Sequence, residues 1–275
     1  MSLSIDSKIK LNNGVLIPAL GLGVYQADAG IETQNAVVHA LKAGYRHIDT
    51  AKFYGNEKDL PVAIKRSGIP REHVFVTTKL WNSDHGYDKT IKACNKSLTQ
   101  LGMPFVDLYL IHFPVRTLRH ESWRAMETLY EEGKCRAIGV SNYTVRQLEE
   151  LLQTSKIVPA VNQVEFHPYL YQKELLDFCH KHHVRLEAYS PLTKGKKLID
   201  PKLTDIAKHY NKSNAQILIR WALQHELIVL PKSTRPERIK ENANVFDFEI
   251  SADDMIALNN FHCNLRVAWD RTNEP

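Results

Sequence analysis

The stretch that decides the fold is Asp107-Leu108-Tyr109-Leu110-Ile111-His112. Its four central residues are all apolar, without the alternation of apolar and polar residues that marks a strand with one solvated face. Strands of a parallel sheet are buried on both faces and therefore show such uninterrupted apolar runs. We predict a buried parallel strand here, which ends at the polar side chain of His112.

Similar short apolar runs recur along the chain, and most are followed by a longer stretch of helical pattern. The eight runs are Ile17–Leu20, Tyr45–Ile48, Val74–Thr78, Val106–Ile111, Ala137–Val140, Ala160–Val164, Arg185–Tyr189 and Leu227–Leu230. They follow one another mostly at about 30 residues, the length of one strand–helix–strand unit. Amphipathic stretches such as Ser122–Glu132 and Val145–Gln153 lie between them. This pattern favours an α/β fold, a closed (β/α)8 TIM barrel, over the alternative of an open doubly wound sheet.

A different pattern precedes the first of these runs. Residues 8–17 alternate in character and turn at Asn13-Gly14, and an Asn-Gly pair between alternating residues is a strong signal for a β-hairpin. We expect an N-terminal β-hairpin that caps one end of the barrel. No linker, charge block or internal repeat interrupts the chain, so we expect a single domain over residues 1–275.

The composition excludes several classes of protein. The chain has 275 residues, 43% hydrophobic and 24% charged, which is unlike collagen, disordered chains or disulfide scaffolds. The net charge of +5 is spread along the chain without a basic stripe, so we expect no nucleic-acid partner. No apolar stretch approaches the roughly 20 residues of a membrane span, and the N-terminal residues lack the features of a signal peptide. We expect a cytoplasmic, monomeric protein without a membrane partner and with free thiols at Cys94, Cys135, Cys179 and Cys263.

Polar side chains stand at or near the ends of seven of the eight runs. They are Asp49, Lys79, His112, Ser141-Asn142, Gln163, Tyr189-Ser190 and Lys232-Ser233. In a barrel the carboxyl ends of all strands meet on one face, where such folds build their active sites. Acid, base, amide and hydroxyl groups on the same face predict an active site there.

Three of the polar residues suggest a proton donor. A free tyrosine has a pKa of about 10, and a neighbouring cation favours the phenolate and lowers that value. We therefore expect Lys79 to lower the pKa of Tyr54, which makes the phenol a general acid near neutral pH. Asp49 would hold Lys79 charged and oriented. The alternative is a buried Asp49–Lys79 salt bridge that only fixes the strand register.

Several longer motifs resemble the aldo-keto reductase family. They are Gly44–Ala51 with Tyr54–Glu57, Thr78–Trp81, Asp107–Pro114, Ile138–Asn142, Asn162–Glu165, Tyr189–Leu192 and Pro231–Ser233. The resemblance covers nearly the whole chain in the order of the family. It implies a (β/α)8 barrel that uses NADPH without a glycine-rich turn and transfers a hydride reversibly between nicotinamide and a carbonyl compound.

The resemblance also implies roles for individual residues. The family's catalytic tetrad falls on Asp49, Tyr54, Lys79 and His112. In these roles Tyr54 protonates the carbonyl oxygen, Lys79 and Asp49 tune Tyr54, and His112 orients the substrate oxygen through a hydrogen bond.

Cofactor contacts are implied by the same resemblance. The carboxamide is expected at Ser141, Asn142 and Gln163, with the nicotinamide ring stacked on Tyr189. The 2′-phosphate and the adenine are expected at Lys232, Ser233, Arg238, Glu241 and Asn242. Further contacts are expected at Gly23, Val24, Tyr25, Asp49, Ser190, Leu192, Thr234 and Arg235. From the residues alone, the alternative for the segment 232–242 is an exposed basic helix start.

Loop lengths bear on the substrate. The segments 115–122 and 193–197 are too short for the pocket loop and the cofactor strap of larger family members. The chain therefore resembles short-looped microbial members, such as reductases of glyoxal, methylglyoxal and diketogluconate and prostaglandin F synthase-like enzymes. We expect a shallow aromatic pocket for small aldehydes, dicarbonyls or keto sugars, lined by Tyr25, Trp81, His112, Phe113 and Trp269.

Three residues depart from the family pattern. Arg235 replaces a small hydroxyl residue, so it either adds a phosphate contact or points into solvent. Pro61 lacks a backbone donor, so the helix after Tyr54 should begin late or kink. Lys52 is expected to face outward. The Phe178–His183 cluster lacks a second ligand group at zinc spacing, and we expect no metal.

Two other functions fit parts of this pattern. A nucleotide-sensing accessory subunit on the same fold would have no need for all four residues of the tetrad. A barrel hydrolase that uses His112 would need a metal cluster or a second catalytic acid, and neither is evident in the sequence. We therefore predict an NADPH-dependent carbonyl reductase whose partner is a small carbonyl substrate.

Overall fold

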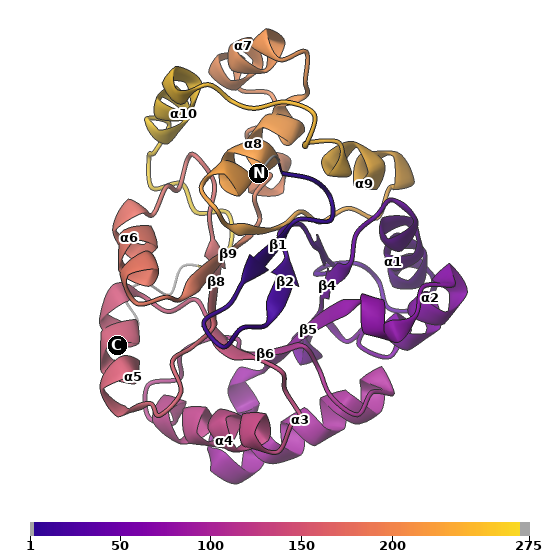
Figure 1. Cartoon of the computed structure of the whole chain (residues 1–275), viewed down its shortest axis with the longest axis vertical. Coiled ribbons are helices and arrows are strands. Elements are labelled where there is room, and N and C mark those ends of the chain that lie inside the picture. Colours follow the sequence, from indigo (N-terminus) through magenta and orange to yellow (C-terminus); the bar gives the residue numbers. More distant parts are fainter. Residues whose placement is uncertain (1–2, 270–275) are drawn as a thin grey trace.

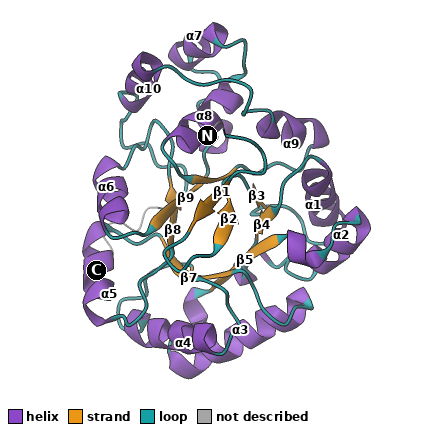
Figure 2. Ribbon diagram, in the orientation of Figure 1, coloured by secondary structure: helices purple, strands orange, loops and turns teal. Residues whose placement is uncertain are grey.

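The core of the molecule is a ring of parallel strands surrounded by helices (Figures 1 and 2). The computed structural model describes residues 3–269. The strands of the ring are β3 (Leu22–Gly23), β4 (His47–Asp49), β5 (Phe75–Leu80), β6 (Leu108–Ile111), β7 (Ile138–Ser141), β8 (Val161–Glu165), β9 (Arg185–Tyr189) and β10 (Ile228–Leu230). Each strand pairs with its neighbour in the sequence, in the order β3 to β10.

The ring is closed between its first and last strands. Leu20 forms a parallel bridge with Val229. The Gly21 N–H donates to the Val229 carbonyl at 2.9 Å, and the Val229 N–H donates to the Ala19 carbonyl at 2.8 Å. These bonds confirm the predicted (β/α)8 barrel, and the alternative of an open doubly wound sheet is wrong.

One predicted strand boundary is wrong. The run Ile17–Leu20 does not form the first barrel strand, because its beginning belongs to the hairpin strand β2 (Leu16–Pro18). The barrel strand β3 follows it and has only two residues. The apolar pattern misled here because hairpin and barrel strands follow each other with only a short connection, and both are buried.

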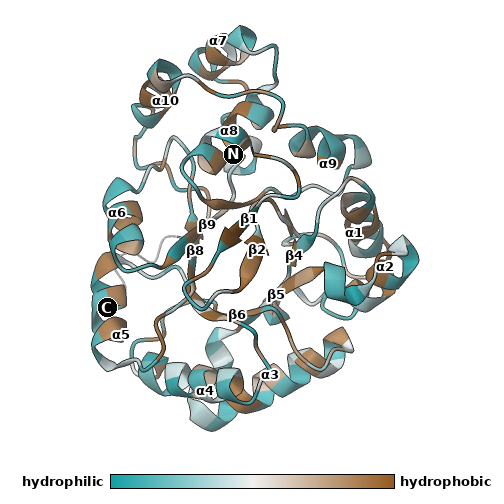
Figure 3. Ribbon diagram, viewed as in Figure 1, coloured by the Kyte–Doolittle hydropathy of each residue, from teal (hydrophilic) through white to brown (hydrophobic). Residues whose placement is uncertain are grey.

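Alternate residues of the strands face opposite sides of the barrel wall. In β6, Leu108 and Leu110 pack inside the barrel with Leu11 and Ile17 of the hairpin region. The residues between them, including Tyr109, belong to the larger cluster that contains the helix side chains. Figure 3 shows brown, apolar positions on several of the central strands, whereas the helices carry both brown and teal positions. Both faces of the strand are therefore buried, as its continuous apolar run predicts.

The predicted N-terminal hairpin closes one end of the barrel. It consists of β1 (Lys8–Lys10) and the antiparallel strand β2. The Asn12 side chain donates to the Pro159 carbonyl at 3.0 Å, and the Asn13 side chain donates to the Arg136 carbonyl at 2.9 Å. Both acceptors precede barrel strands, so the hairpin covers the amino-terminal end. The carboxyl-terminal end is left for the site.

The helices form the outer layer (Figure 1). They are α1 (Ile31–Lys42), α2 (Asp59–Ser67), α3 (Tyr87–Leu101), α4 (Arg119–Glu131), α5 (Val145–Thr154), α6 (Lys173–Lys181), α7 (Pro201–His209), α8 (Asn214–Gln224), α9 (Pro236–Ala243) and α10 (Ala252–Asn259). Short 3-10 turns are η1 (Lys52–Tyr54), η2 (Arg71–His73), η3 (Asn82–Asp84) and η4 (Thr193–Gly195). Within residues 3–269, no helix is long and apolar enough to cross a membrane.

Pro61 determines where α2 can begin. The helix starts at Asp59, so Pro61 lies in its first turn, where a backbone N–H has no partner inside the helix. The helix therefore begins late, several residues after Tyr54, which is one of the two outcomes predicted for Pro61; the other was a kink.

Candidate active site

A cavity of about 620 Å³ opens at the carboxyl-terminal end of the barrel. Most of the residues predicted to form the site line it, and they come from strand ends, loops and the helix α9, which are far apart in the sequence. The predicted residues in its wall are Gly23, Tyr25, Asp49, Tyr54, His112, Phe113, Ser141, Gln163, Tyr189, Ser190, Leu192, Lys232, Ser233, Arg238, Glu241, Asn242 and Trp269. Five others, Val24, Trp81, Asn142, Thr234 and Arg235, are outside the lining, and Lys79 lies behind it, fully buried.

Asp49, Lys79 and Tyr54 meet at the bottom of the cavity. The Lys79 ammonium donates to both carboxylate oxygens of Asp49, at 2.6 and 2.7 Å, and to the Thr50 carbonyl at 3.0 Å. It also lies 3.3 Å from the phenol oxygen of Tyr54. Because β4 and β5 are adjacent parallel strands with Asp49 opposite Thr77, the strand register brings Asp49 and Lys79 together, and the turn η1 brings Tyr54 to them. The Asp49–Lys79 pair is therefore more than a salt bridge between two strands, because Lys79 also contacts the phenol of Tyr54.

The electrostatics of Tyr54 correct one sequence prediction. We expected Lys79 to lower the pKa of Tyr54, but the pKa is raised well above its ordinary value. Burial is the main cause, and the neighbouring charge of Asp49 adds to it. The prediction counted the cation and overlooked both the desolvation of the phenol and the carboxylate beside it. Tyr54 is therefore protonated at neutral pH.

His112 ends β6 at the same side of the cavity. Burial and the nearby Lys79 charge hold the pKa of His112 well below its usual value, so the imidazole is neutral. Its ring centroid lies 5.8 Å from that of Tyr54. A neutral imidazole and a protonated phenol thus stand side by side, and both can donate a hydrogen bond to an oxygen atom in the cavity.

A polar layer beneath Asp49 was not foreseen from the sequence. The Gln163 amide donates to Asp49 Oδ2 at 2.9 Å and to Glu187 Oε2 at 2.6 Å. Glu187 is fully buried in β9, and burial together with the charge of Asp49 raises its pKa to about 8. Sequence analysis missed Glu187 because a single acid within a strand run has no distinguishing pattern.

Asn142 lies beside the cavity without lining it. Its amide nitrogen donates to the His112 carbonyl at 3.0 Å, and its amide oxygen accepts from the Tyr189 hydroxyl at 2.8 Å. Asn142 has a positive φ of 63°, a conformation that asparagine tolerates better than most residues. In this arrangement Asn142 fixes the position of Tyr189, whose side chain lines the cavity.

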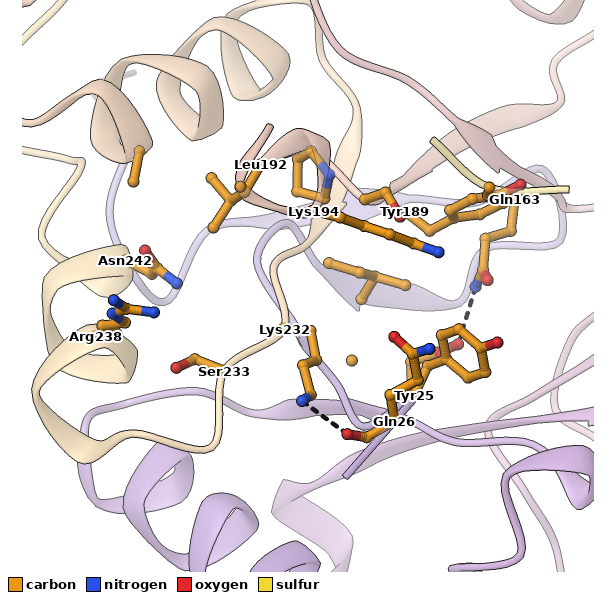
Figure 4. A pocket seen from close by; sticks show the side chains of 18 of the residues that line it. Tyr25, Gln26, Gln163, Tyr189, Leu192, Lys194, Lys232, Ser233, Arg238 and Asn242 are labelled. Carbon is orange, nitrogen blue, oxygen red and sulfur yellow. Dashed lines mark hydrogen bonds between the residues drawn. The ribbon is translucent and has the colours of Figure 1, made fainter. Parts of the chain in front are cut away.

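The other end of the cavity is basic. Figure 4 shows Ser233, Arg238 and Asn242 gathered at one end of the pocket and Gln163 at the other. Lys232 is exposed and donates to the Gln26 carbonyl at 2.9 Å, across the strand ends (Figure 4). Arg238 is exposed in the first turn of α9.

Arg235 and Lys52, two of the departures from the family pattern, face away from the cavity. Arg235 is exposed and pairs with Glu237. Of the two predictions for this residue, a phosphate contact or a side chain in solvent, the structure has the second. Lys52 pairs with Asp84 and does not line the cavity, as expected.

Lys194 was missed by sequence reasoning. It lies in the short turn η4 and lines the cavity, with its ammonium 5.8 Å from the ring centroid of Tyr25. Figure 4 shows Leu192, Lys194 and Tyr189 along one wall, facing Tyr25, Gln26 and Lys232. The segment 193–197 is short, yet Lys194 and Gly195 line the cavity, and the backbone φ angles are positive at Thr193, Lys194 and Gly195.

Aromatic rings form the remaining wall. Trp81 stacks on Phe53, with centroids 3.9 Å apart, and Phe53 rather than Trp81 lines the cavity. Trp269 lies 5.6 Å from Phe53 and 6.0 Å from Phe113, centroid to centroid. The predicted aromatic pocket is thus present, with Phe53 as a member that sequence reasoning missed.

No metal-binding group is evident in the part of the chain that the structure describes. No group of three or more His, Cys, Asp or Glu side chains is placed to hold a metal ion within residues 3–269. In the Phe178–His183 segment, the His182 ring packs on Phe178 with centroids 4.4 Å apart.

Comparisons with known proteins agree with this geometry. Residues 19–262 match the model of the aldo/keto reductase family. The chain is 49% identical to glyoxal reductase of Bacillus subtilis, over 97% of each chain. It is 48% identical to the 9,11-endoperoxide prostaglandin H2 reductase of Trypanosoma cruzi, over 96% of this chain and 95% of that protein. A Bombyx mori aldo-keto reductase solved in complex with NADP superimposes with a TM-score of 0.91 at 36% identity, covering 98% of this chain and 97% of that one.

These matches identify the class of protein. The chain belongs to the aldo-keto reductase family and is an oxidoreductase.

Proposed function

We propose that the protein reduces small aldehydes and ketones to alcohols, with Tyr54 as the proton donor. The observation that carries this proposal is the contact of Tyr54 with the buried Lys79–Asp49 pair at the wall of the cavity, at 3.3 Å from Lys79 to the phenol oxygen. A proton donor beside a fixed cation is the arrangement that carbonyl reduction requires, because negative charge develops on the carbonyl oxygen.

The residues of the cavity fit NADPH. Exposed cations at Lys232 and Arg238 stand at one end and suit a phosphate dianion. Amide and hydroxyl groups of Ser141 and Gln163 stand at the other end, where a carboxamide would need partners. Tyr189 provides a flat face between them. NADPH, when bound, supplies the hydride of the reaction.

Tyr54 transfers its proton to the substrate oxygen in this proposal. The raised pKa keeps the phenol protonated until the reaction, when the developing alkoxide becomes a stronger base. The phenolate left behind lies beside the Lys79 ammonium, which stabilises it, and Asp49 holds that ammonium in place through two short bonds. The neutral imidazole of His112 donates a hydrogen bond to the same substrate oxygen and orients it.

The substrate class follows from the shape and chemistry of the wall. Phe53, Phe113 and Trp269 form an apolar surface beside Tyr54, and the loops around it are short. We propose small aldehydes, dicarbonyls of the methylglyoxal type or keto sugars as substrates. The B. subtilis relative named glyoxal reductase supports the dicarbonyl class.

The test is the loss of NADPH absorbance at 340 nm with a panel of small aldehydes, methylglyoxal, keto sugars and quinones. We expect consumption with at least one dicarbonyl or aldehyde and none without substrate. Binding of NADPH without consumption by any carbonyl would instead favour a nucleotide-sensing subunit.

A further inference from the structure

Glu165 is a buried acid at the mouth of the barrel that the proposed reaction does not use. It follows Gln163 by two residues on β8, so both side chains point to the same side of the sheet. Its exposed fraction is 2%. A buried carboxylate is costly unless hydrogen bonds satisfy it, so its partners indicate what it holds.

The partners of Glu165 come from the C-terminal segment. The Val267 N–H donates to Oε1 at 2.7 Å, and the Ala268 N–H donates to Oε2 at 3.0 Å. The ring of His167, two residues after the end of β8, lies 3.0 Å from Oε1. Burial alone would raise the pKa of Glu165, but the hydrogen bonds from His167 and the two backbone groups hold it below its usual range. The side chain is therefore an ionised anchor for the chain at residues 267–268.

Trp269 is the next residue along this segment. Its ring faces Phe53 and Phe113 and lines the cavity, yet half of the residue is exposed. Further upstream, the N–H groups of Cys263 and Leu265 donate to the Tyr169 carbonyl at 3.2 and 3.1 Å. The bonds to Glu165 are thus the backbone attachments adjacent to the tryptophan.

We propose that Glu165 is a specificity-determining residue, because its carboxylate fixes the segment Val267–Ala268 and thereby holds Trp269 as a wall of the substrate pocket. This inference rests on the proposed carbonyl reductase activity. Glu165 touches neither the reacting atoms nor Tyr54, so it is a positioning residue. Its effect should be confined to substrates large enough to reach Trp269.

Another buried glutamate provides a matched control. Glu127 in α4 is 6% exposed and accepts from the Lys156 N–H at 2.7 Å and the Ile157 N–H at 2.9 Å. The Trp123 ring N–H also donates to it, at 3.1 Å. It anchors backbone as Glu165 does, but it holds a segment that does not contact Trp269. Glutamine keeps one acceptor oxygen, so Glu165→Gln loses the acceptor for one of its two backbone donors, whereas Glu127→Gln can keep all three bonds through one oxygen and controls for the loss of a buried negative charge.

The test compares two dicarbonyls that share one reacting group. Phenylglyoxal carries a ring where methylglyoxal carries a methyl group, so only phenylglyoxal can pack on Trp269. We expect Glu165→Gln to lower the ratio of kcat/KM for phenylglyoxal to that for methylglyoxal by about fivefold, through KM, because a lost aromatic contact weakens ground-state and transition-state binding alike. Trp269→Ala should lower the ratio by a similar factor, and the double variant should be no worse than the worse single one.

The ratio of kcat/KM for phenylglyoxal to that for methylglyoxal also serves to judge the control variant and the outcomes that would contradict the inference. Glu127→Gln should keep the wild-type ratio. A ratio within twofold of wild type in Glu165→Gln, losses that multiply in the double variant, or an equal fall in Glu127→Gln would each overturn the inference. A wild-type protein that consumes NADPH with neither dicarbonyl would instead contradict the proposed substrate class.

A second variant covers the case in which Glu165→Gln does not fold. Ala268→Pro removes the N–H that donates to Oε2 and leaves the barrel strand untouched. It should lower the ratio in the same direction by at least twofold, since one of the two attachments is lost. An unchanged ratio in a folded Ala268→Pro protein would also overturn the role of Glu165.

Discussion

The two ends of the cavity are organised in opposite ways. At the bottom, Asp49 and Lys79 lie on the strands β4 and β5 and Tyr54 lies in the turn η1; Lys79 contacts both partners and is fully buried. At the other end, Lys232 and Arg238 are exposed side chains on a loop and a helix start. Groups that move a proton need fixed geometry before the substrate arrives, whereas groups that attract a phosphate can be arranged by the phosphate itself. We propose that the bottom of the cavity determines the chemical rate and the basic end determines cofactor affinity and choice.

Tyr54→Phe should give the largest effect, because it deletes the proton donor and keeps the ring. We expect kcat to fall by about 10²–10⁴, the usual range for loss of a general acid. NADPH oxidation at 340 nm with methylglyoxal measures it. Tyr109→Phe, which deletes a fully buried hydroxyl outside the cavity, should retain kcat within about twofold. Near-normal turnover by a folded Tyr54→Phe protein would refute the proton-donor role.

Asp49→Asn and Lys79→Met should act on the same function. Either single change leaves a buried partner without its counter-charge, at a cost of roughly 3–5 kcal/mol in the free energy of unfolding. The double variant should be little worse than the worse single variant, both in kcat and in urea denaturation, because residues that act as a unit do not add. If the losses multiply, the three side chains do not work as one group.

Arg238→Ala tests the basic end. We expect the Kd for NADPH to rise at least about tenfold, or about 1.4 kcal/mol, while the Kd for NADH stays within about twofold. Fluorescence titration with both cofactors measures this. Arg235→Ala is the matched control, since Arg235 is also exposed but pairs with Glu237 outside the cavity. Equal weakening for both cofactors would mean that Arg238 does not recognise the 2′-phosphate.

The smallest effect should be that of pH. The raised pKa of Tyr54 keeps the phenol protonated to well above pH 10, and the lowered pKa of His112 keeps the imidazole neutral to well below pH 6.5. We therefore expect kcat for reduction to change by less than about twofold between about pH 6 and pH 8. We expect the ionisation of Glu187 near pH 8 to add a small inflection there, which Glu187→Gln should remove. A basic limb that persists in Glu187→Gln would indicate a lower pKa for Tyr54 than we infer.

Much of this architecture could be predicted from the sequence because it depends on local patterns. Continuous apolar runs such as Leu108–Ile111 identify barrel strands, and polar residues at their ends identify the face of the site. The strand β3 was misplaced because a two-residue strand leaves almost no pattern. Phe53 and Lys194 were missed because their place in the wall depends on how turns fold back over the strand ends.

The electrostatic prediction failed for a different reason. The sequence places Lys79 near Tyr54 but does not reveal how deeply the phenol is buried or how close Asp49 comes to it. Desolvation of the phenol and the neighbouring charge of Asp49 raise its pKa well above the ordinary value. Similarly, the motif Asn162–Glu165 gives no hint that Glu165 binds the backbone of a segment about a hundred residues later.

The division of labour between the two ends can be tested in one paired measurement. NADPH Kd and the kcat at saturating NADPH are determined for Tyr54→Phe and Arg238→Ala side by side. We predict that Tyr54→Phe loses kcat by at least about a hundredfold and keeps its Kd within about threefold, whereas Arg238→Ala shows the reverse, with Kd raised about tenfold and kcat at saturation nearly intact. If Arg238→Ala lost kcat as severely as Tyr54→Phe, or if Tyr54→Phe no longer bound NADPH, the two ends of the cavity would not have the separate roles that we propose.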